Sequence, residues 1–188
     1  ARRLMEEGKR VITQKFIQTG NTDMSEDIVK HREIMGIGLQ PEDLDHTTAP
    51  VIFSYPASAQ LAARIDGREI DLEAIDRATE RLKSLYDIVL IEGAGGLAVP
   101  ITDTFMSIDY AESRKLPVIL VTNGILGSIN HTVLSLEAIR SRGMQLAAVI
   151  YNEHFDTDPV IAEDTRGFIA RYVARNFPDA RFATVGSL

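Results

Sequence analysis

The segment that most constrains the fold is residues 85–101, LYDIVLIEGAGGLAVPI, in which an apolar run stops at an acidic residue and three nearby glycines. The run 88–91 is rich in β-branched residues and too short for a helix, so it predicts a buried strand that opens into a loop. Glu92 would then lie at the carboxyl end of that strand, which is the edge where ligands bind in open α/β sheets. A glycine-rich turn with a solvated Glu92 is the alternative interpretation of this segment taken alone.

The rest of the chain alternates short apolar runs with amphipathic segments. One of the amphipathic helices is predicted by four apolar residues that recur at helical spacing, Leu72, Ile75, Leu82 and Leu85. Alternating helices and buried apolar strands are typical of an α/β fold with a parallel sheet covered by helices on both faces. We expect strands at 11–16, 88–91, 118–122, 146–151 and 182–185, and helices from residue 23 or 25 to 35, within 56–67, and at 70–86, 107–115, 129–142 and 159–176.

Composition limits the number of domains and the kinds of partner. The chain has 188 residues, 45% of them hydrophobic, and no Pro/Gly/Ser-rich linker, so we expect a single α/β domain over residues 1–188. A formal charge of -7 disfavours nucleic acid or an anionic membrane as a partner, and no apolar stretch approaches the roughly 20 residues that span a bilayer. The absence of cysteine excludes disulfides and thiolate chemistry and fits a reducing cytoplasm.

The chain starts in an unusual way. Its first ten residues, ARRLMEEGKR, are typical of the last turns of an amphipathic helix that ends at Gly8, and no helix start signal precedes them. We therefore expect the natural protein to have a further element upstream of residue 1.

Charged side chains fall near the carboxyl ends of the expected strands, which should converge on one edge of the sheet. Lys15 and Thr19 follow the strand at 11–16, and Asp27 lies in the first turn of the next helix. Lys15 could instead extend to solvent, and the helix dipole alone explains an acid at position 27. His31, further along the same helix, is interpreted as a surface residue.

The loop at 124–130 predicts an anion site. Gly124 and Gly127 precede a helix that begins near Ile129, so unpaired backbone N–H groups and the positive end of the helix dipole should face out of the loop. Ser128 or Asn130 could instead cap the helix, because capping and anion binding use the same groups.

Asn152 follows the strand at 146–151 and carries both a donor and an acceptor. That combination suits recognition of a nucleobase edge. An ordinary turn residue is the alternative interpretation.

Six motifs, in this order along nearly the whole chain, resemble the dethiobiotin synthetase family of P-loop enzymes. The combination of EGAGG, LPVILV and LGSINH is specific, whereas EGAGG alone is not. The resemblance implies a doubly wound, mostly parallel sheet of the P-loop NTPase type, with the first strand and a GxxxxGK[ST] phosphate loop upstream of residue 1. The motifs are KFIQTG at 15–20, SED at 25–27, IEGAGGLAVPI at 91–101, LPVILV at 116–121, GILGSINHT at 124–132 and YNE at 151–153.

The same resemblance implies an activity, a cofactor and an assembly. The activity is ATP- and magnesium-dependent closure of a ureido ring, which converts 7,8-diaminononanoate and carbon dioxide to dethiobiotin through a carbamate and a carbamic-phosphoric anhydride. The expected assembly is a cytoplasmic homodimer with shared sites, and neither nucleic acid nor membrane is an expected partner.

By motif, the resemblance assigns a role to each expected site residue. Lys15 is the catalytic residue, and the substrate-binding set is Lys15, Thr19, Leu126, Gly127 and Asn130. Asp27 and Glu92 are the magnesium ligands, and the nucleotide-binding set is Asp27, Glu92, Gly93, Ala94, Gly95, Asn152 and Glu153. The histidines are interpreted as non-catalytic: His31, His46, His131 and His154.

The chain also departs from the family pattern. Phe16 stands where the family usually has proline, the PxSPH run appears as Pro-Ala-Ser-Ala-Gln at 56–60, and no tyrosine occupies the first turn after Pro159. Two alternatives to an enzyme remain open at this point. They are a regulatory partitioning-type ATPase, which would need a basic face or a terminal amphipathic helix, and a non-catalytic nucleotide-binding relative of the same fold.

Overall fold

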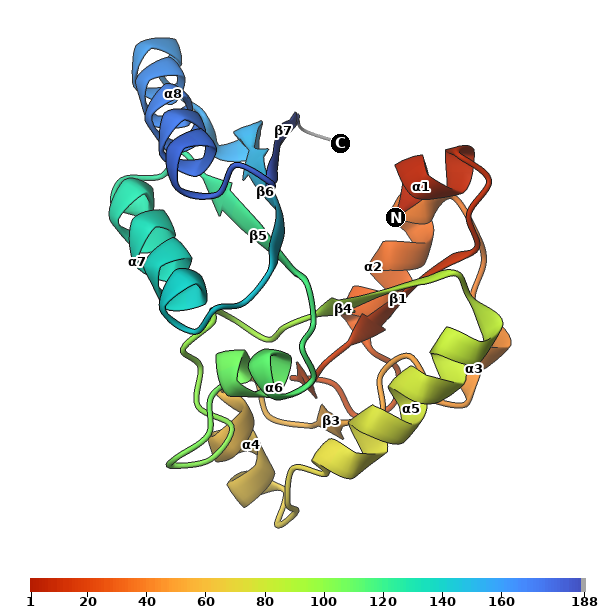
Figure 1. Ribbon diagram of the computed structural model, residues 1–188. Coiled ribbons are helices and arrows are strands. Elements are labelled where there is room, and N and C mark those ends of the chain that lie inside the picture. The colour runs from red at the N-terminus through yellow and green to blue at the C-terminus, as the bar shows by residue number, and fades with distance from the viewer. Residues whose placement is uncertain (187–188) are drawn as a thin grey trace. The chain divides into compact units, whose positions relative to one another are not determined.

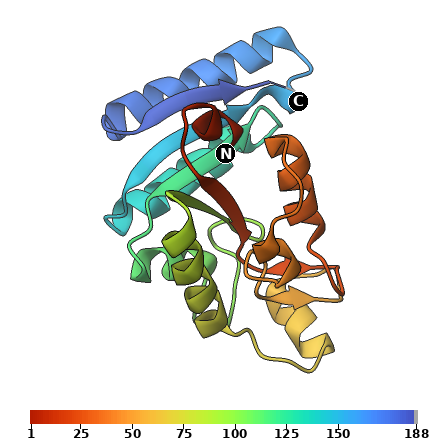
Figure 2. The same ribbon diagram turned by 90° about the vertical axis from the view of Figure 1, so that its right-hand side faces the viewer.

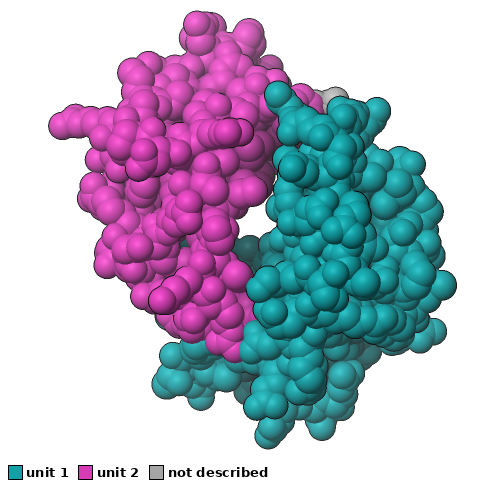
Figure 3. Space-filling view, turned by 45° about the vertical axis from the view of Figure 1, so that its right-hand side comes forward, with its two compact units in different colours: residues 1–108 teal, residues 109–188 magenta. Residues whose placement is uncertain are grey.

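The computed structural model describes residues 1–186, so the last two residues of the expected domain lie outside the described part. The described chain forms two compact units, residues 1–108 and residues from 109 onward, which Figure 3 shows in different colours. A single domain over residues 1–188 stays a prediction. Each unit is described by itself below.

Unit 1 (residues 1–108) contains two short parallel sheets, β1–β4 and β2–β3. Helix α2 packs against β1 and α5 packs against β4, while α4 covers the small β2–β3 pair (Figure 1). The elements are α1 (Arg2–Glu6), β1 (Val11–Lys15), β2 (Gln18–Thr19), α2 (Glu26–Met35), α3 (Pro41–Leu44), β3 (Ile52–Phe53), α4 (Ala59–Ile65), α5 (Leu72–Leu85) and β4 (Ile88–Glu92).

Unit 2 is built on one parallel sheet with strand order β5–β6–β7. Helix α8 packs on β7, beside which it runs in Figure 2, and α7 packs on β5 and also contacts α8. The elements are α6, which begins at the end of unit 1 (Ser107–Ser113), β5 (Val118–Asn123), α7 (Ser128–Ser141), β6 (Leu146–Asn152), the 3-10 turn η1 (Glu153–Phe155), α8 (Pro159–Asn176) and β7 (Arg181–Val185).

The expected α/β class with parallel strands is confirmed, but two strands that were expected to be buried, β4 and β5, are buried only in part. In unit 1, β1 is buried at every position, whereas β4 is only partly buried. The reason is that β1 has backbone partners on both sides near its end, since it pairs with β4 and its Lys15 N–H donates to Thr48 O at 2.7 Å. In unit 2, β5 alternates in burial and exposes Ile119 and Val121, because α7 packs against one side of the strand.

Local sequence signals explain where the helices begin. Ser25, rather than Asp23, caps α2, because its hydroxyl accepts a hydrogen bond from the N–H of Ile28. Asp71 caps α5 in the same way, as the sequence indicated. The left-handed φ of +72° at Gly36 ends α2. The cap at Ser25 fixes the first turn of α2 and with it the position of Asp27.

Candidate functional site

The first candidate site lies in unit 1, where β1 and β4 end side by side. Lys15 and Glu92 are direct partners in the parallel register of the two strands. The ammonium Nζ of Lys15 lies 2.6 Å from Asp27 Oδ2, 3.1 Å from Glu92 Oε1 and 3.4 Å from the carbonyl oxygen of Gly93. The Lys15 side chain is only 8% exposed, so the interpretation that it extends to solvent is wrong. The structure brings together four of the expected site residues here.

Glu92 is held as a carboxylate. Burial raises the pKa of Glu92, but the hydrogen bond with His31 and the positive charge of Lys15 outweigh that effect, and the net pKa lies below its ordinary value. Glu92 is 47% exposed, so the interpretation as a solvated turn residue describes its exposure, but it does not account for the contacts of the carboxylate with Lys15 and His31. An ionised, partly buried carboxylate beside a second one, Asp27, is the kind of oxygen pair that a magnesium ion uses as partial ligands.

His31 is part of this cluster, which the sequence interpretation missed. Its Nε2 lies 2.6 Å from Glu92 Oε2 and its Nδ1 lies 3.0 Å from Thr13 Oγ1. The assignment of His31 to the surface is wrong, because its side chain is only 20% exposed. The signal that could have found it is spacing, since His31 lies four residues after Asp27 and therefore on the same face of α2.

A buried ion pair lies behind the cluster. Arg32 and Asp43 are almost fully buried, with Nη2 to Oδ1 at 2.7 Å and Nε to Oδ2 at 2.9 Å. Burial raises the pKa of Asp43, but hydrogen bonds from Arg32, Gln40 N–H and Thr48 outweigh it, and the net pKa lies below its ordinary value. Arg32 also donates to the hydroxyl of Thr13 at 2.7 Å, which links the ion pair to His31.

Two other expected residues of unit 1 occupy different positions. Thr19 lies on β2 opposite Phe53, and no hydrogen bond to the Lys15 cluster is recorded for its side chain within the described residues. Gly95 follows the cluster in the loop after β4 with a φ of +77°. A Cβ at this position would lie 2.9 Å from the Val99 side chain, so both backbone conformation and space favour glycine there.

In unit 2, β5 and β6 also end side by side, since Asn123 and Asn152 are direct partners. The loop that follows β5 leads into α7, whose N-cap is Gly127 with a φ of +91°. Neither Ser128 nor Asn130 is the N-cap residue, so the capping alternative is wrong. The start of α7 therefore lacks a side-chain cap, which leaves its free backbone N–H groups for another partner.

Leu126 and Ser128 differ sharply in exposure. Leu126 is fully exposed, whereas the hydroxyl of Ser128 is buried and has no hydrogen-bond partner among the described residues. Gly124 sits where no larger residue fits, because a Cβ there would lie 2.5 Å from Tyr151 Oη and still closer to Asp156 Oδ1. These two groups are hydrogen-bonded to each other at 2.9 Å, and burial together with Asp156 raises the pKa of Tyr151 to about 12.

Asn152 and Glu153 already have partners in the structure. The Asn152 side-chain oxygen accepts a hydrogen bond from the N–H of His154 at 3.0 Å and so caps the 3-10 turn η1. Glu153 Oε1 lies 2.6 Å from Arg166 Nη1. Asn152 is thus a turn residue as far as its side-chain oxygen is concerned, and its amide nitrogen is still able to donate a hydrogen bond.

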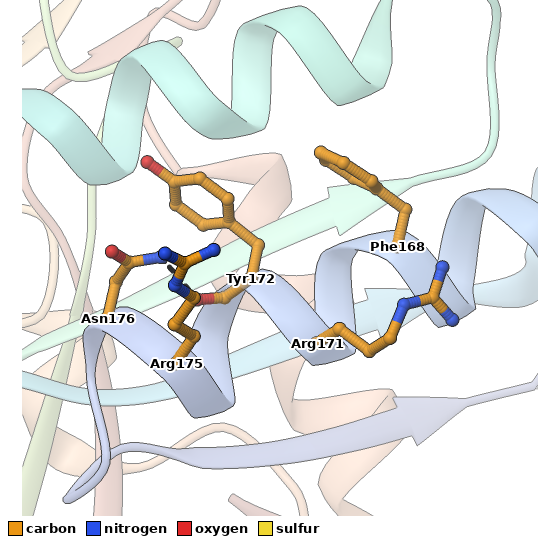
Figure 4. Close-up of a pocket in the computed structure, with 5 residues that line it drawn as sticks. All are labelled: Phe168, Arg171, Tyr172, Arg175 and Asn176. Atoms are coloured by element: carbon orange, nitrogen blue, oxygen red, sulfur yellow. Dashed lines mark hydrogen bonds between the residues drawn. The ribbon is translucent and has the colours of Figure 1, made fainter.

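A hollow of about 500 Å³ lies along α8 and contains none of the expected site residues (Figure 4). It is lined by Phe168, Arg171, Tyr172, Arg175 and Asn176. Asn176 donates to the carbonyl oxygen of Tyr172 at 2.8 Å, and the Tyr172 hydroxyl bonds to Glu137. Two of the polar side chains that line the hollow, Asn176 and Tyr172, are thus hydrogen-bonded within the chain.

Two negative observations apply to the described residues. No group of three or more His, Cys, Asp or Glu side chains there is arranged to hold a metal ion. None of the helices in the described part is both long and apolar enough to cross a membrane.

Comparison with known proteins places these observations in a family. The AAA domain family matches residues 3–177, so the class of the protein is an α/β nucleotide-binding domain of the P-loop NTPase type. The ATP-dependent dethiobiotin synthetase BioD of Chlorobaculum tepidum is 51% identical over 175 residues, which are 93% of this chain and 73% of that protein. The chain belongs to the dethiobiotin synthetase family, as its motifs predicted.

Two further relatives have similar coverage. The ATP-dependent dethiobiotin synthetase BioD 2 of Pasteurella multocida is 46% identical over 182 residues, which are 97% of this chain and 85% of that protein. The protein of the same name from Haemophilus influenzae is 47% identical over 163 residues, which are 87% of this chain and 85% of that protein.

Proposed function

We propose that this chain is an ATP- and magnesium-dependent dethiobiotin synthetase that closes the ureido ring of dethiobiotin on 7,8-diaminononanoate. The observation that carries the proposal is the buried ammonium of Lys15, 2.6 Å from Asp27 and 3.1 Å from Glu92. A fixed cation beside two carboxylates suits a reaction in which an anionic carbamate meets a metal-bound phosphate. The names of the related proteins, which are ATP-dependent dethiobiotin synthetases, support the same reaction.

The reaction has three bond-forming steps. One amine of the substrate attacks carbon dioxide, a C–N bond forms, and that nitrogen releases a proton to give a carbamate. A carbamate oxygen then attacks the γ-phosphorus of ATP, the bond from that phosphorus to the bridging oxygen breaks, and ADP leaves. The second amine attacks the carbonyl carbon of the mixed anhydride, expels phosphate and loses its proton to water, which closes the ring.

The unit 1 cluster supplies charge and position for these steps. Lys15 would stabilise the carbamate oxygen as its charge moves towards phosphorus, because phosphoryl transfer depends on positioning and charge neutralisation. Asp27 and Glu92 fit a magnesium ion as oxygen ligands, with ATP phosphates and water completing its shell. When bound, the ion neutralises charge on the phosphates. Gly93, Ala94 and Gly95 would leave room for them.

Residues of unit 2 would hold the ends of the two substrates. The uncapped start of α7, with Leu126, Gly127 and Asn130, would receive the substrate carboxylate. The amide nitrogen of Asn152, with Glu153, would face the adenine. Thr19 would contact the diamine end of the substrate. We also propose a cytoplasmic homodimer in which each site draws the carboxylate loop from one subunit and Lys15 from the other.

The test of the proposed function is dethiobiotin formation from diaminononanoate, carbon dioxide and ATP by the full-length protein. Lys15→Ala should lower kcat by about 100- to 1,000-fold, since it removes a cation from the reacting carbamate. Lys83→Ala removes an exposed lysine that pairs with Glu80 and should leave the rate unchanged.

Two results would overturn the proposal. One is wild-type protein that binds ATP but forms no dethiobiotin. The other is a Lys15→Ala variant with a normal rate at saturating diamine. Stimulation of ATP hydrolysis by DNA or vesicles without diamine would favour a regulatory ATPase instead.

A further inference from the structure

Two elements of unit 1 hold the two oxygens of Glu92 separately. Lys15, at the end of β1, donates to Oε1 at 3.1 Å, and His31, in the middle of α2, approaches Oε2 at 2.6 Å. The Glu92 side chain is itself 47% exposed, so packing alone does not fix its rotamer. The hydrogen bonds from the two sides therefore set the direction in which the carboxylate faces.

The ring of His31 is in turn fixed from behind. Its Nδ1 lies 3.0 Å from the hydroxyl of Thr13, and that hydroxyl accepts a hydrogen bond from Arg32 Nη1 at 2.7 Å. Arg32 also donates to the backbone oxygen of Thr13 at 3.2 Å, and its own position is set by the buried pair with Asp43. A continuous chain of contacts thus runs from the interior of unit 1 to Glu92.

The donor and acceptor inventory of this chain places a proton on Nε2 of His31. A guanidinium group only donates, so Arg32 occupies one lone pair of the Thr13 hydroxyl. That hydroxyl keeps one proton and one further lone pair, so its contact with Nδ1 of His31 can form in either direction. On the other side of the ring, the Glu92 carboxylate only accepts, so Nε2 of His31 carries the proton that is donated to it.

We propose that His31 is a positioning residue that aims Glu92 at the magnesium–ATP site through its Nε2–H, with the ring held from behind by Thr13 and Arg32. The proposal rests on the proposed function, in which Glu92 is a magnesium ligand. With Lys15 on Oε1 and His31 on Oε2, each oxygen of the Glu92 carboxylate has its own donor, and the two donors together set the direction in which the carboxylate faces.

The test separates the two contacts of the His31 ring, Nε2 with Glu92 and Nδ1 with Thr13, by substitution in the full-length protein. His31→Gln places an amide N–H near the Nε2 position and keeps the contact with Glu92. His31→Asn can reach only Thr13, and His31→Leu makes neither contact. The matched control is His46→Asn, the same chemical change at an exposed histidine of the loop after α3.

The main readout is binding of Mn²⁺ in the presence of ATP, measured by electron paramagnetic resonance. Loss of a hydrogen bond that orients a metal-binding carboxylate typically lowers metal affinity 10- to 100-fold, so we expect about that loss for His31→Leu and His31→Asn. His31→Gln should retain most of the wild-type affinity, and His46→Asn should match wild type. Equal Mn²⁺ affinity for wild type and His31→Leu would overturn the proposal.

Nitrogen NMR of the wild-type protein is an independent readout. We expect the Nε2 of His31 to be protonated and hydrogen-bonded to Glu92, and Thr13→Val should weaken this signature because it removes the hydroxyl that holds the ring. An unprotonated Nε2 in wild type would contradict the proposal.

These readouts distinguish failure of this inference from failure of the proposed function. A wild-type protein that makes no dethiobiotin, yet loses Mn²⁺ affinity on His31→Leu but not on His31→Gln, overturns the proposed reaction and supports the role of His31. Normal dethiobiotin formation with unchanged Mn²⁺ affinity in all His31 variants supports the proposed reaction and overturns the role of His31.

Discussion

Lys15 is a charged side chain inside unit 1, and two carboxylates compensate the cost of removing its charge from water. The same residues explain why the sequence was informative about this site. Parallel strands end at a common edge, so Lys15 at the end of β1 and Glu92 at the end of β4 were expected to meet there. Spacing within α2 would have added His31, since it lies one helical turn after Asp27.

The buried pair behind this site could not be predicted from the sequence. Arg32 and Asp43 are eleven residues apart, in different helices, and each looks like an ordinary surface charge in its local segment. Only the packing of α2 against α3 and β1 brings them together. Periodicity reports which face of a helix is apolar, whereas this pair lies on a buried face without being apolar.

Asp43→Asn tests the energetic role of this pair. It leaves the guanidinium of Arg32 buried without its anion, and we expect a loss of about 3–5 kcal/mol in the free energy of unfolding at neutral pH. Denaturant unfolding measures this loss. Asp179→Asn, at an exposed turn, is the control and should change stability by less than about 0.5 kcal/mol. Equal stability of the two variants would contradict a structural role for the pair.

The same pair predicts a pH dependence. Because the pKa of Asp43 is lowered in the folded state, its ionisation stabilises the fold at pH values above the ordinary carboxyl pKa of 3.8. That contribution is lost as the pH falls below 3.8 and through the lower folded-state pKa. Stability should therefore fall less steeply in this acid range for Asp43→Asn than for wild type.

At the scale of elements, the most restrictive position is Gly124, between β5 and α7. A Cβ there would overlap Asp156 Oδ1 and lie 2.5 Å from Tyr151 Oη, so the loop after β5 fits against β6 and η1 only without a side chain. The sequence suggested an anion-binding loop as the reason for this glycine. Close packing within unit 2 is a sufficient physical reason by itself.

Gly124→Ala should accordingly lower the free energy of unfolding by about 1–3 kcal/mol, the usual cost of overpacking. Thermal unfolding measures the change, and Gly38→Ala, where a Cβ would meet nothing within 4 Å, is the control. Adding Asp156→Ala removes the carboxylate that the new Cβ would strike, so the cost of Gly124→Ala should be smaller in that background. If Gly124→Ala costs as much stability in the Asp156→Ala background as in wild type, the contact with Asp156 is not the source of the strain.

Element boundaries were predicted well where a capping side chain marked them and less well where burial depended on neighbours. Asp71 fixed the start of α5, and the cap of α2 proved to be the second of the two candidates, Ser25. By contrast, the apolar run of β4 was expected to be fully buried and is not. A hydrophobic run indicates that a strand packs against other elements, but the sequence does not show whether the fold covers one face of the strand or both.

At the scale of the whole molecule, the proposed dimer makes the strongest prediction. Lys15 belongs to unit 1 and the start of α7 to unit 2, and a shared site would combine them across a two-fold axis. Lys15→Ala and Asn130→Asp should each lower dethiobiotin formation to a small fraction of the wild-type rate, the second because a new negative charge repels the substrate carboxylate.

Mixing the two inactive variants should restore activity as subunits exchange, because a heterodimer has one intact site of its two. Mixing two samples of the same variant is the control. An inactive mixture despite exchange verified by mass spectrometry, or a fully active monomer, would exclude shared sites.

The complete burial of β1 also has a consequence for motion. Local opening of a protein starts where few side chains are buried, and α1, just before β1, buries none. Amide hydrogens of α1 should therefore exchange with solvent quickly, whereas those of β1 should exchange only in openings that disrupt the interior of unit 1. Lys15 lies at the end of this strand, so we expect its backbone amide to be among the slowly exchanging ones.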